Sequence, residues 1–545
     1  MKIISIVSYK ELNQSLEYIK LSDKFADGFE LRLDYLSNIT LNKAKLDEIN
    51  NFISKIICLY NKNIIITLRD FHQGGSYQGS LENKLKIFDN IALNNKDYNK
   101  LYFDFEYYID DKILEKFRID YSEINIIRSY HDFNNTPEKI LAKLVCSKIK
   151  RNIFYKIVTT AKSSLDSVKL LNFLKNTKTK YPDLNVIAHC MGECGAFSRI
   201  INGIYGSKFS YGFLDSVLDS NNNINKKLYC VPIQDLFSIY RVNNLNLNTK
   251  IYALLGNPVF HSQGHIFHNQ AFLKLKENAV YVKIKLNQAE IDEFFYTIKN
   301  LNFSGFSITM PLKEQIYKYT KVNDTSELIK AINTIKIIKN NNKYILESYN
   351  TDGAGAYKAL CDYNNIKDFN KHFSNKNILI LGAGGASKSV ILEFLNRSNN
   401  INITILNRTI TNAYNIESIF NNLLNKSMSN INVYSFSNFI TNYFFNNNLD
   451  KYDYIINTIS GDILKNNTEF KILLENISNI LHENSIVMDI NYYNNILDVI
   501  PKNIRALHGK LMFEYQAKFL YFFQVFLFEY LHHFLSSKIT INILV

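Results

Sequence analysis

Short runs of β-branched and other apolar residues recur along the first 245 residues, separated by longer mixed segments of helical length. Runs of this length and composition are typical of strands, and helix-length spacers between them indicate parallel α/β units. We predict eight strands: Ile3–Ser8, Phe29–Leu33, Ile64–Leu68, Leu101–Phe105, Ile124–Ser129, Ile153–Val158, Val186–Ala188 and Lys208–Phe213. Eight strands in this rhythm predict a (β/α)8 barrel over residues 1–245.

A polar segment at 243–248 ends this series, and a second series of alternating strands and helices begins at Ile251. Farther along, an apolar strand at 377–381 runs directly into the glycine turn 382–387, which reads GAGGAS and precedes an amphipathic run. A strand, a glycine turn and a helix in this order form the arrangement that places a pyrophosphate at a helix N-terminus. The Asn-rich stretch 421–450 is predicted to form a surface helix and a loop.

Charge and composition narrow the class of protein. The 545 residues include 63 Lys and Arg against 50 Asp and Glu, a net charge of +13, without a block of consecutive basic residues. This favours a solvated surface over a nucleic-acid partner and is compatible with small anionic substrates. Only 19 glycines and 6 prolines are present, so the clusters of glycine indicate tight turns or close backbone approaches.

Cysteines and apolar segments indicate neither a disulfide scaffold nor a membrane protein. The six cysteines are scattered. His189, Cys190 and Cys194 lack a second ligand pair, so we expect packing thiols and no metal site. The apolar stretch 519–535 contains Gln, Glu and His residues, which favours a buried terminal helix over a membrane span. A strand begins almost at Met1 in place of a leader, and we therefore expect a cytoplasmic protein.

Charged side chains lie at the predicted carboxyl ends of the barrel strands, where reacting groups of such barrels lie. Lys156 lies inside the sixth apolar strand, where burial favours a neutral, nucleophilic amine, and His131 at the end of the fifth strand can move a proton near neutral pH. Glu30 shares a strand face with an arginine two residues later. Three arginines suited to a carboxylate complete the group: Arg32, Arg69 and Arg199. A lone lysine of this kind is more often an edge residue that reaches solvent; the combination favours attack on a ketone.

Residues 1–245 resemble type I 3-dehydroquinate dehydratase. The resemblance lies in five short segments: ELRLD at 30–34, TLR at 67–69, SYHDF at 129–133, YKI at 155–157 and MGxxGxxSR at 191–199. It implies that Lys156 forms a Schiff base with the C3 ketone of the substrate and that His131 removes the C2 proton. By the same resemblance Glu30 orients His131, and the three arginines hold the hydroxyls and the carboxylate.

Four further strings precede the glycine turn: GNPVFHS at 256–262, SITMPLK at 307–313, AINT at 331–334 and YNTDG at 349–353. Each alone is an ordinary turn or helix entry. In this order, ahead of GAGGAS, they resemble shikimate dehydrogenase across about residues 250–545. The resemblance implies that Lys313 and Asp352 form the proton-transfer pair. It also implies four substrate-binding side chains: Ser262, Thr309, Asn333 and Gln516.

The segment after the next strand indicates the cofactor. Arg408 stands about 25 residues after the first glycine of the turn, where an NAD-preferring site carries an acid for the ribose. An arginine offers a partner for a 2′-phosphate, so NADP is the expected cofactor. The expected cofactor contacts are Gly382, Gly384, Gly385, Ala386, Asn407, Arg408 and Thr409.

These observations predict an α/β protein with an N-terminal (β/α)8 barrel followed by a two-domain α/β dehydrogenase with a Rossmann-like cofactor domain. The expected limits are 1–245 for the dehydratase barrel, 250–360 (completed by 505–545) for the substrate domain and 370–500 for the NADP-binding domain. The resemblances imply two consecutive steps of aromatic amino-acid biosynthesis, with 3-dehydroquinate, 3-dehydroshikimate and shikimate as small-molecule partners. Oligomeric state stays open.

Three positions depart from the family patterns and keep alternatives open. Gln73 replaces an acid after the third strand, Gly264 replaces a serine, and Leu511 replaces a glycine near the C-terminus; the loop expected to close over the substrate is not recognisable in 219–232. One alternative is that one half is a non-catalytic binding or regulatory module. Another is that the second site prefers quinate.

Overall fold

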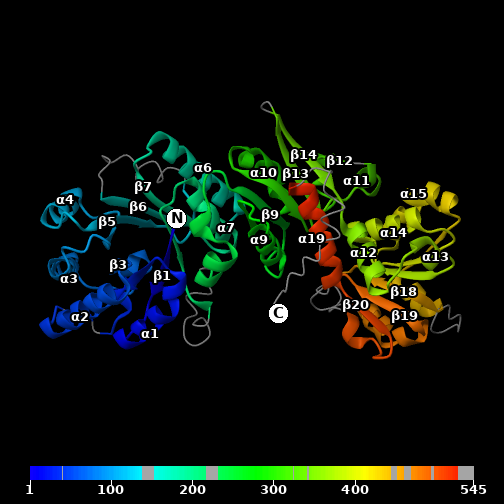
Figure 1. The fold of residues 1–545 in the computed structure, drawn as a ribbon, viewed down its shortest axis with the longest axis horizontal. Helices are drawn as coiled ribbons and strands as arrows, with labels where there is room; N and C mark the ends of the chain where they lie inside the picture. The colour runs from blue at the N-terminus through cyan, green and yellow to red at the C-terminus, as the bar shows by residue number, and fades with distance from the viewer. Residues whose placement is uncertain are drawn as a thin grey trace. The chain divides into compact units, whose positions relative to one another are not determined.

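The computed structural model describes residues 1–37, 39, 41–137, 152–215, 231–322, 324–340, 343–442, 451–459, 468–491 and 496–525. The chain forms two compact units, Met1–Phe303 and a second that begins at Ser304, and each is described by itself (Figure 1). This division differs from the limits expected from the sequence, which stay a prediction.

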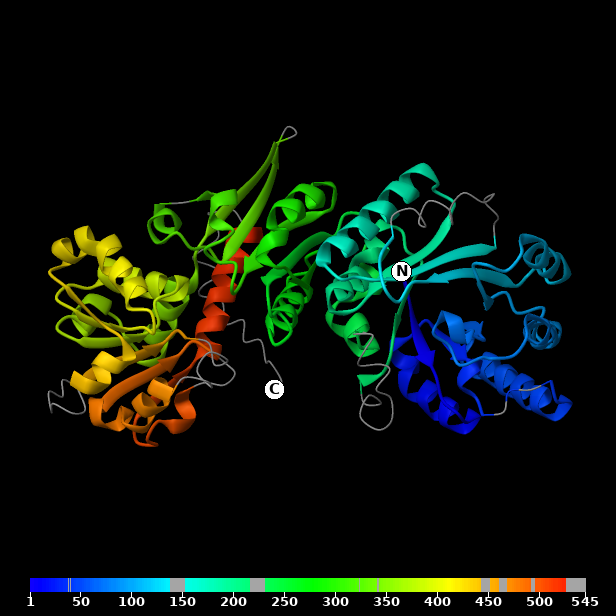
Figure 2. The same ribbon diagram turned by 180° about the vertical axis from the view of Figure 1, so that it is seen from behind.

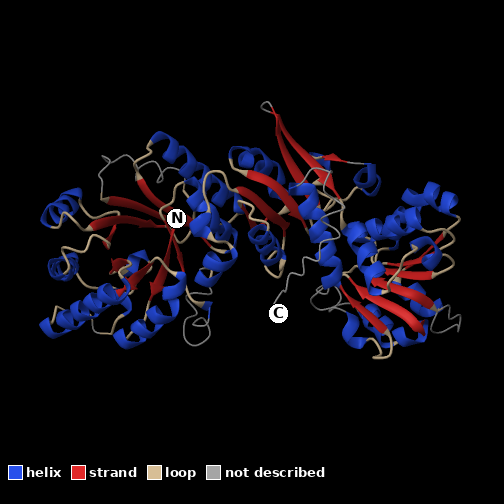
Figure 3. Ribbon diagram, viewed as in Figure 1, coloured by secondary structure: helices blue, strands red, loops and turns tan. Residues whose placement is uncertain are grey.

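The first unit begins with a parallel eight-stranded sheet that curls into a barrel (Figures 1 and 3). Its strands are β1 (Lys2–Val7), β2 (Gly28–Arg32), β3 (Asn63–Thr67), β4 (Leu101–Glu106), β5 (Asn125–His131), β6 (Ile153–Thr160), β7 (Asn185–Met191) and β8 (Phe209–Gly212). They follow the order β7-β6-β5-β4-β3-β2-β1-β8, and an isolated bridge between Val186 and Ser207 lies on the side where the barrel closes. The predicted (β/α)8 barrel is confirmed.

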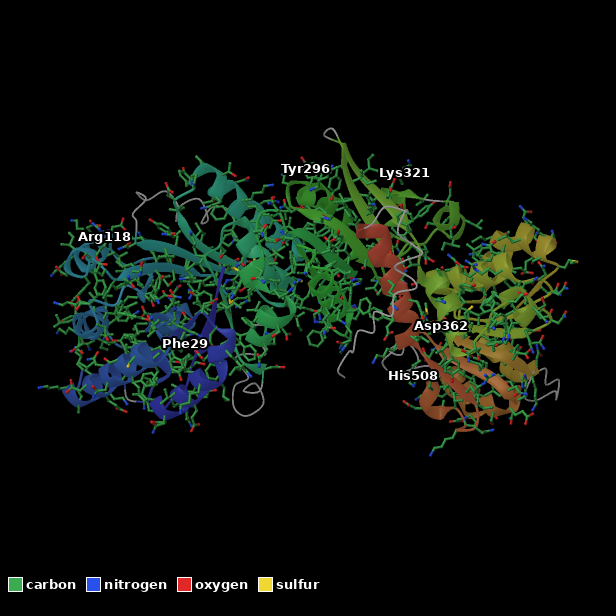
Figure 4. The ribbon with its side chains drawn as sticks, in the orientation of Figure 1. Phe29, Arg118, Tyr296, Lys321, Asp362 and His508 are labelled. Atoms are coloured by element: carbon green, nitrogen blue, oxygen red, sulfur yellow. The ribbon has the colours of Figure 1, made fainter. Side chains whose placement is uncertain are left out.

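Helices lie outside the barrel, as the colouring of Figure 3 shows: α1 (Leu12–Ser22), α2 (Lys43–Tyr60), α3 (Leu81–Asn94), α4 (Asp111–Asp120), α6 (Ser164–Lys180) and α7 (Ala196–Ile201). Side chains point alternately to the two faces of each barrel strand, so one set packs outward against the helices and the other packs inside the barrel. Phe29 of β2, labelled in Figure 4, is fully buried. Its ring packs edge-on against Tyr60 of α2. Apolar side chains such as Ile65, Tyr102 and Ile187 form a cluster within the barrel. Polar groups therefore gather nearer the carboxyl ends of the strands.

The first unit continues beyond the barrel with β9 (Lys250–Gly256), β10 (Ala279–Lys285), α9 (Gly264–Lys274) and α10 (Ile291–Thr297). Helix α6 of the barrel holds this part through polar contacts. Ser164 Oγ donates to the carbonyl of Lys285 at 2.6 Å, and Asn172 Nδ2 donates to the carbonyl of Thr297 at 3.1 Å. On α10, Phe294 is buried, whereas the neighbouring Tyr296 is 74% exposed (Figure 4).

The second unit contains the strands β11 (Phe303–Ile308), β13 (Thr334–Asn340), β14 (Lys343–Tyr349) and β12 (Lys321–Val322), in that order in the sheet. Its helices here are α11 (Asp324–Ile329), α12 (Asp352–Tyr363) and α19 (Gly509–Val525). Helix α19, coloured red, packs against α12 (Figures 1 and 2). Gly355 of α12 permits the close approach, because a Cβ there would lie 3.1 Å from Gln516 Cβ of α19.

The second unit also holds a six-stranded parallel sheet in the order β17-β16-β15-β18-β19-β20. The strands are β15 (Asn377–Leu381), β16 (Asn402–Leu406), β17 (Asn430–Tyr434), β18 (Tyr452–Asn457), β19 (Leu481–Asp489) and β20 (Arg505–His508). Its helices are α13 (Phe369–Phe373), α14 (Gly385–Arg397), α15 (Ile410–Ser427), α16 (Phe436–Ile440) and α18 (Thr468–Glu475). This strand order is that of a dinucleotide-binding sheet, whose order reverses at β15. The Rossmann-like fold is confirmed.

One element of this sheet was not expected. The Asn-rich stretch 421–450 contains strand β17, not only a helix and a loop, and residues 443–450 lie outside the described residues. In β17 Ile431 is buried between the exposed Asn430 and Asn432, so burial alternates from residue to residue as it does in an edge strand. Asparagine is a poor strand former, which is why the sequence did not indicate this strand.

The described part of α19 ends at Val525, and the rest of the apolar stretch 519–535 lies outside the described residues. Among the described helices, none combines the length and hydropathy needed to cross a membrane.

Candidate active sites

Lys156 is buried in the barrel between two carboxylates. Its amine donates to Glu30 Oε1 at 2.9 Å and to Asp104 Oδ2 at 3.2 Å, and its side chain is 5% exposed. The aromatic ring of Tyr211 on β8 completes the surroundings, with its centroid 4.2 Å from the amine. The sequence indicated an apolar environment for this amine; the structure shows an ionic one, because Glu30 and Asp104 face the barrel interior.

Arg69 extends this ionic cluster. Its guanidinium lies 2.7 Å from Asp104 Oδ2 and donates to Ser129 Oγ at 2.6 Å, and its side chain is 3% exposed. Burial alone would raise the pKa of Asp104, but the positive charges of Arg69 and Lys156 outweigh it and lower that pKa below its ordinary value. Asp104 is therefore an ionised bridge between the arginine and the lysine.

Sequence reasoning missed Asp104 and its neighbour Glu106, which binds the buried Lys84 of α3 at 2.8 Å. The sequence does contain a signal that points to these two acids. Two acids two residues apart in an otherwise apolar strand share the inward face, as Glu30 and Arg32 do.

His131 ends β5 and lies parallel to the ring of Phe133, with ring centroids 6.2 Å apart. Its Nδ1 is buried and makes no hydrogen bond within the described part of the chain. Burial, reinforced by the positive charges of Arg69 and Lys156, lowers the pKa of His131 well below its ordinary value. The imidazole is therefore neutral at neutral pH and able to accept a proton. Among the described residues, Glu30 accepts from the side chains of Thr67 and Lys156, and its role in orienting His131 stays a prediction.

The two remaining arginines of the barrel differ in their partners. Arg32 forms a forked ion pair with Asp34, at 2.9 and 2.7 Å, and is partly exposed. Arg199 of α7 donates to the carbonyl of Tyr211 at 2.8 Å, while its Nε is buried without a partner in the described residues. Gln73, at a position where the family carries an acid, likewise has a buried amide oxygen without such a partner. Arg199 and Gln73 thus keep polar atoms available to a ligand.

Lys313 and Asp352 meet in the second unit. The amine of Lys313 donates to Asp352 Oδ2 at 2.6 Å; the lysine is 20% exposed and the aspartate 3%. Asp352 is the first residue of α12, where the helix dipole favours a negative charge. The predicted proton-transfer pair is therefore in contact, with the lysine on its accessible side.

Asn333 and Gln516 hold the other oxygen of the same carboxylate. The amide nitrogen of Asn333 donates to Asp352 Oδ1 at 2.8 Å and also to Thr351 Oγ1 at 3.0 Å. Gln516 Nε2 donates to Asp352 Oδ1 at 2.5 Å from α19. Both hydrogens of the Asn333 amide are therefore engaged within the protein, and the side chain fixes Asp352 in place.

The remaining two predicted substrate residues belong to different units. Thr309 follows β11 in the second unit and is partly buried. Ser262 belongs to the first unit, where its Oγ accepts from the backbone N–H of Gly264 at 3.1 Å at the start of α9. Gly264 thus begins a helix, and Ser262 accepts one of the backbone N–H groups that have no partner within the helix.

The glycine turn lies at the carboxyl end of β15, and α14 begins at Gly385. Gly382 has φ +107°, which a side chain would strain, and a Cβ on Gly385 would meet Ala331 Cβ at 2.8 Å and Lys313 Cβ at 3.9 Å. A Cβ on Gly384, in contrast, would meet nothing within 4 Å. The turn is thus close to Lys313 and leaves room for a ligand against bare backbone.

Two more features of this turn fit a dinucleotide. The first turn of the thirteen-residue helix α14 has backbone N–H groups without intrahelical partners, as every helix does, and these can donate to a pyrophosphate. Arg408 is exposed directly after β16, and Asn407 Nδ2 bonds to the carbonyl of Thr409 at 2.9 Å. The residues present therefore fit a dinucleotide that carries a 2′-phosphate.

The two clusters define the class of the protein. A buried lysine with carboxylate partners lies beside a neutral histidine in a parallel barrel, and a Lys–Asp pair lies beside a dinucleotide-type glycine turn. This is an α/β enzyme that combines a barrel active site with a nucleotide-dependent oxidoreductase.

Comparison with known proteins gives the family. Residues 3–241 match the family described as Type I 3-dehydroquinase, and residues 254–335 match Shikimate dehydrogenase substrate binding domain. A shikimate dehydrogenase (NADP(+)) of Methanococcus vannielii is 34% identical over 281 residues, which cover 50% of this chain and 90% of that protein. The chain belongs to the shikimate dehydrogenase family and carries a type I dehydroquinase domain ahead of it.

Two relatives align with most of the chain. The shikimate biosynthesis protein AroDE of Chlamydia pneumoniae is 29% identical over 413 residues, which cover 75% of this chain and 77% of that protein. A bifunctional 3-dehydroquinate dehydratase/shikimate dehydrogenase, chloroplastic, of Arabidopsis thaliana is 28% identical over 411 residues. That alignment covers 73% of this chain and 63% of the plant protein, slightly less than two thirds of its length.

Proposed function

We propose that the chain catalyses two consecutive reactions of shikimate biosynthesis: dehydration of 3-dehydroquinate to 3-dehydroshikimate, and NADPH-dependent reduction of 3-dehydroshikimate to shikimate. The observation that carries the proposal is the presence of two lysine-centred clusters in one chain. Lys156 lies between Glu30 and Asp104 in the barrel, and Lys313 contacts Asp352 beside the glycine turn.

In the barrel, the neutral form of the Lys156 amine attacks the C3 ketone, and loss of one water gives an imine. Glu30 and Asp104 are the groups close enough to exchange protons with this nitrogen. His131, neutral because burial lowers its pKa, accepts the C2 proton. His131 passes this proton to the hydroxyl β to the former carbonyl, which leaves as water, and hydrolysis of the imine releases product and restores the amine.

Three arginines are proposed to bind the substrate of the barrel. The Nε of Arg199, which has no partner among the described residues, is suited to the carboxylate, and the forked Arg32 lies in the more exposed part of the site. Arg69 binds Asp104 at 2.7 Å and Ser129 at 2.6 Å, so we assign it a role in fixing the charged cluster in addition to substrate contact.

In the second unit, Lys313 donates a proton to the carbonyl oxygen that becomes the hydroxyl of shikimate. Asp352 is the group with which Lys313 exchanges protons. Asn333 and Gln516 keep the carboxylate of Asp352 in position, since both donate to its Oδ1. Ser262 and Thr309 are proposed to bind hydroxyl or carboxylate groups of the substrate.

The cofactor-binding residues are proposed to be Gly382, Gly384, Gly385, Ala386, Asn407, Arg408 and Thr409. NADPH supplies the hydride when bound. The glycine turn permits close approach of the pyrophosphate to the backbone, and the guanidinium of Arg408 pairs with the 2′-phosphate.

A coupled assay tests the proposal. The purified chain receives 3-dehydroquinate and NADPH, and both shikimate formation and NADPH oxidation are followed. Shikimate is expected in an amount equal to the NADPH consumed. Reduction of added 3-dehydroshikimate without conversion of 3-dehydroquinate would contradict the dehydratase half and favour a non-catalytic barrel. The relative rates of shikimate and quinate oxidation with NADP decide between these two substrates of the second site. The cytoplasmic location is part of the proposal, and cell fractionation with activity measurement checks it.

A further inference from the structure

Besides His131 Nδ1 and Asp104 Oδ1, three polar atoms on β7, β8 and α7 are buried and make no hydrogen bond with the described residues: His189 Nδ1, Tyr211 OH and Arg199 Nε. Each of these three residues is at most 3% exposed. Buried polar atoms are nearly always hydrogen-bonded, because a lost bond to water is otherwise not replaced. Polar atoms buried in this way on neighbouring elements indicate a surface that a polar ligand completes.

The strands explain why these side chains converge. His189 follows Ile187 by two residues on β7, and Ile187 and Tyr211 belong to the same cluster inside the barrel. Residues two apart on a strand share a face, so His189 points into the barrel above Ile187. The rings of His189 and Tyr211 lie 6.0 Å apart, and the ring of Tyr211 lies 4.2 Å from the amine of Lys156. Arg199 donates a hydrogen bond to the carbonyl of Tyr211 and is thereby held at β8, the strand that carries this ring.

The charges of the three groups differ. Burial, with the positive charges of Arg199 and Lys156, lowers the pKa of His189 well below its ordinary value. Burial, with the negative charges of Glu30 and Asp104, raises the pKa of Tyr211 well above its ordinary value. Both side chains are therefore neutral hydrogen-bonding groups at neutral pH, and Arg199 is the cation.

We propose that His189 and Tyr211 are substrate-binding residues of the barrel that hydrogen-bond ring hydroxyls of a cyclic polyhydroxy keto acid, while Arg199 takes its carboxylate. The inference rests on the dehydratase reaction proposed above and adds the groups that recognise the hydroxyls. Neutral donors and acceptors suit hydroxyl groups, since a hydroxyl both donates and accepts and carries no charge. A site built to bond a hydroxyl rejects an analogue that lacks it, because its buried polar group then stays unpaired.

The test combines Tyr211→Phe with substrate analogues. This substitution removes one hydroxyl and keeps the ring beside Lys156, and Tyr102→Phe is the control, because its hydroxyl bonds to Asn63 elsewhere in the same barrel. His189→Leu and His189→Asn form a second pair, in which only asparagine keeps a hydrogen-bonding group. We measure kcat/KM for 3-dehydroquinate and for analogues that lack the C4 or the C5 hydroxyl, and check folding by circular dichroism and the melting temperature.

We expect Tyr211→Phe and His189→Leu each to lower kcat/KM for 3-dehydroquinate about tenfold. His189→Asn should recover part of the loss, and Tyr102→Phe should retain the wild-type value. For at least one deoxy analogue, the variant and the wild type should have the same kcat/KM, because the bond is already lost.

Two results contradict the inference in distinguishable ways. Equal losses on every analogue, or unchanged kcat/KM in folded Tyr211→Phe and His189→Leu variants, overturn the assignment of hydroxyl contacts alone. If the wild-type chain forms no borohydride-trapped adduct with 3-dehydroquinate and does not dehydrate it, the proposed reaction fails, and this inference fails with it.

Discussion

Asp104 Oδ2 contacts both Arg69, at 2.7 Å, and Lys156, at 3.2 Å, so one buried carboxylate links the arginine that follows β3 to the lysine of β6. A buried group that keeps two cations in place has a double effect when its charge is removed. The cations lose a partner, and their positions are no longer fixed.

Asp104→Asn should therefore lower the dehydratase kcat about a hundredfold and also lower the melting temperature of the chain. Asp111→Asn is the control, because Asp111 is 71% exposed in its ion pair with Arg128 and should change neither value. The rate of dehydration and the melting temperature are measured for both variants. Wild-type dehydration by a folded Asp104→Asn chain would show that the bridge does not serve the reaction.

Lys156→Arg should abolish the borohydride-trapped adduct and dehydration, since a guanidinium cannot form the imine. NADP-dependent oxidation of shikimate should stay at the wild-type rate, because that reaction uses the Lys313 cluster. The adduct is detected by mass spectrometry of the intact chain. An adduct that persists would place the imine on another lysine.

Asp352→Asn should lower kcat for shikimate oxidation by about a hundredfold or more. The carboxylate accepts from Lys313, Asn333 and Gln516, and an amide at this position directs its own hydrogens toward one of these donors. Asp362→Asn, on the same helix but partly exposed and paired with Lys358, should leave this rate unchanged. The dehydratase rate of both variants serves as the measure of correct folding of the barrel.

Gly384→Ala should raise the KM for NADPH about tenfold and leave the melting temperature unchanged. No protein atom lies within 4 Å of the added Cβ, so the folded chain is not strained. The Cβ instead collides with a ligand that lies against this backbone, which weakens cofactor binding. A lower melting temperature with an unchanged KM would show that Gly384 is needed for folding and not for cofactor binding.

Arg408→Gln should reduce the preference for NADPH over NADH about tenfold, through a higher KM for NADPH alone. Arg397→Gln removes an exposed arginine that pairs with Glu393 on α14 and should leave the preference unchanged. The ratio of kcat/KM for the two cofactors is the quantity compared. An equal change for both cofactors would argue against a contact with the 2′-phosphate.

The free energy of unfolding should fall as the pH is lowered from about 6.5 toward 3. Burial lowers the pKa of His268 from 6.5 to about 3, so in this window the unfolded chain binds a proton that the folded chain does not. Each such histidine removes about 1.4 kcal/mol of stability per pH unit within the window. The pKa of His265, lowered mainly by burial and further by Lys283, also falls to about 3, which steepens the slope.

His268→Phe keeps the stacking on Tyr281, whose ring lies 4.4 Å away, and removes the titrating group. Urea unfolding at several pH values should therefore show a smaller slope for this variant, by about one proton. An identical slope would mean that His268 takes up its proton at the same pH in the folded and in the unfolded chain.

Most of the fold follows from local patterns. The eight barrel strands lie within one to three residues of their predicted limits, because their β-branched runs are buried on both faces and are bounded by polar turns. Strand β17 escaped notice because asparagine, not a strand former, occupies its exposed positions. Only its pairing with β16 makes this segment a strand.

The candidate sites were predictable to a different degree. Lys313 and Asp352 were expected to act as a pair, and their side chains lie 2.6 Å apart, while their roles stay a prediction. The engagement of Asn333 with Asp352 and Thr351 could not be foreseen, since motifs show which residues gather but not which hydrogen bonds they use up. His189 was considered only as a metal ligand, although its two-residue offset from Ile187 already placed it on the inward face.

The polar contacts of α6 also constrain how the first unit is made on the ribosome. Ser164 and Asn172 reach carbonyl groups that lie 121 and 125 residues later in the chain. A nascent barrel that has emerged only as far as the linker at 243–248 still exposes this side of α6. Its folding is complete only after β10 and α10 have emerged, so the face of α6 that carries Ser164 and Asn172 is among the last parts of the first unit to be covered.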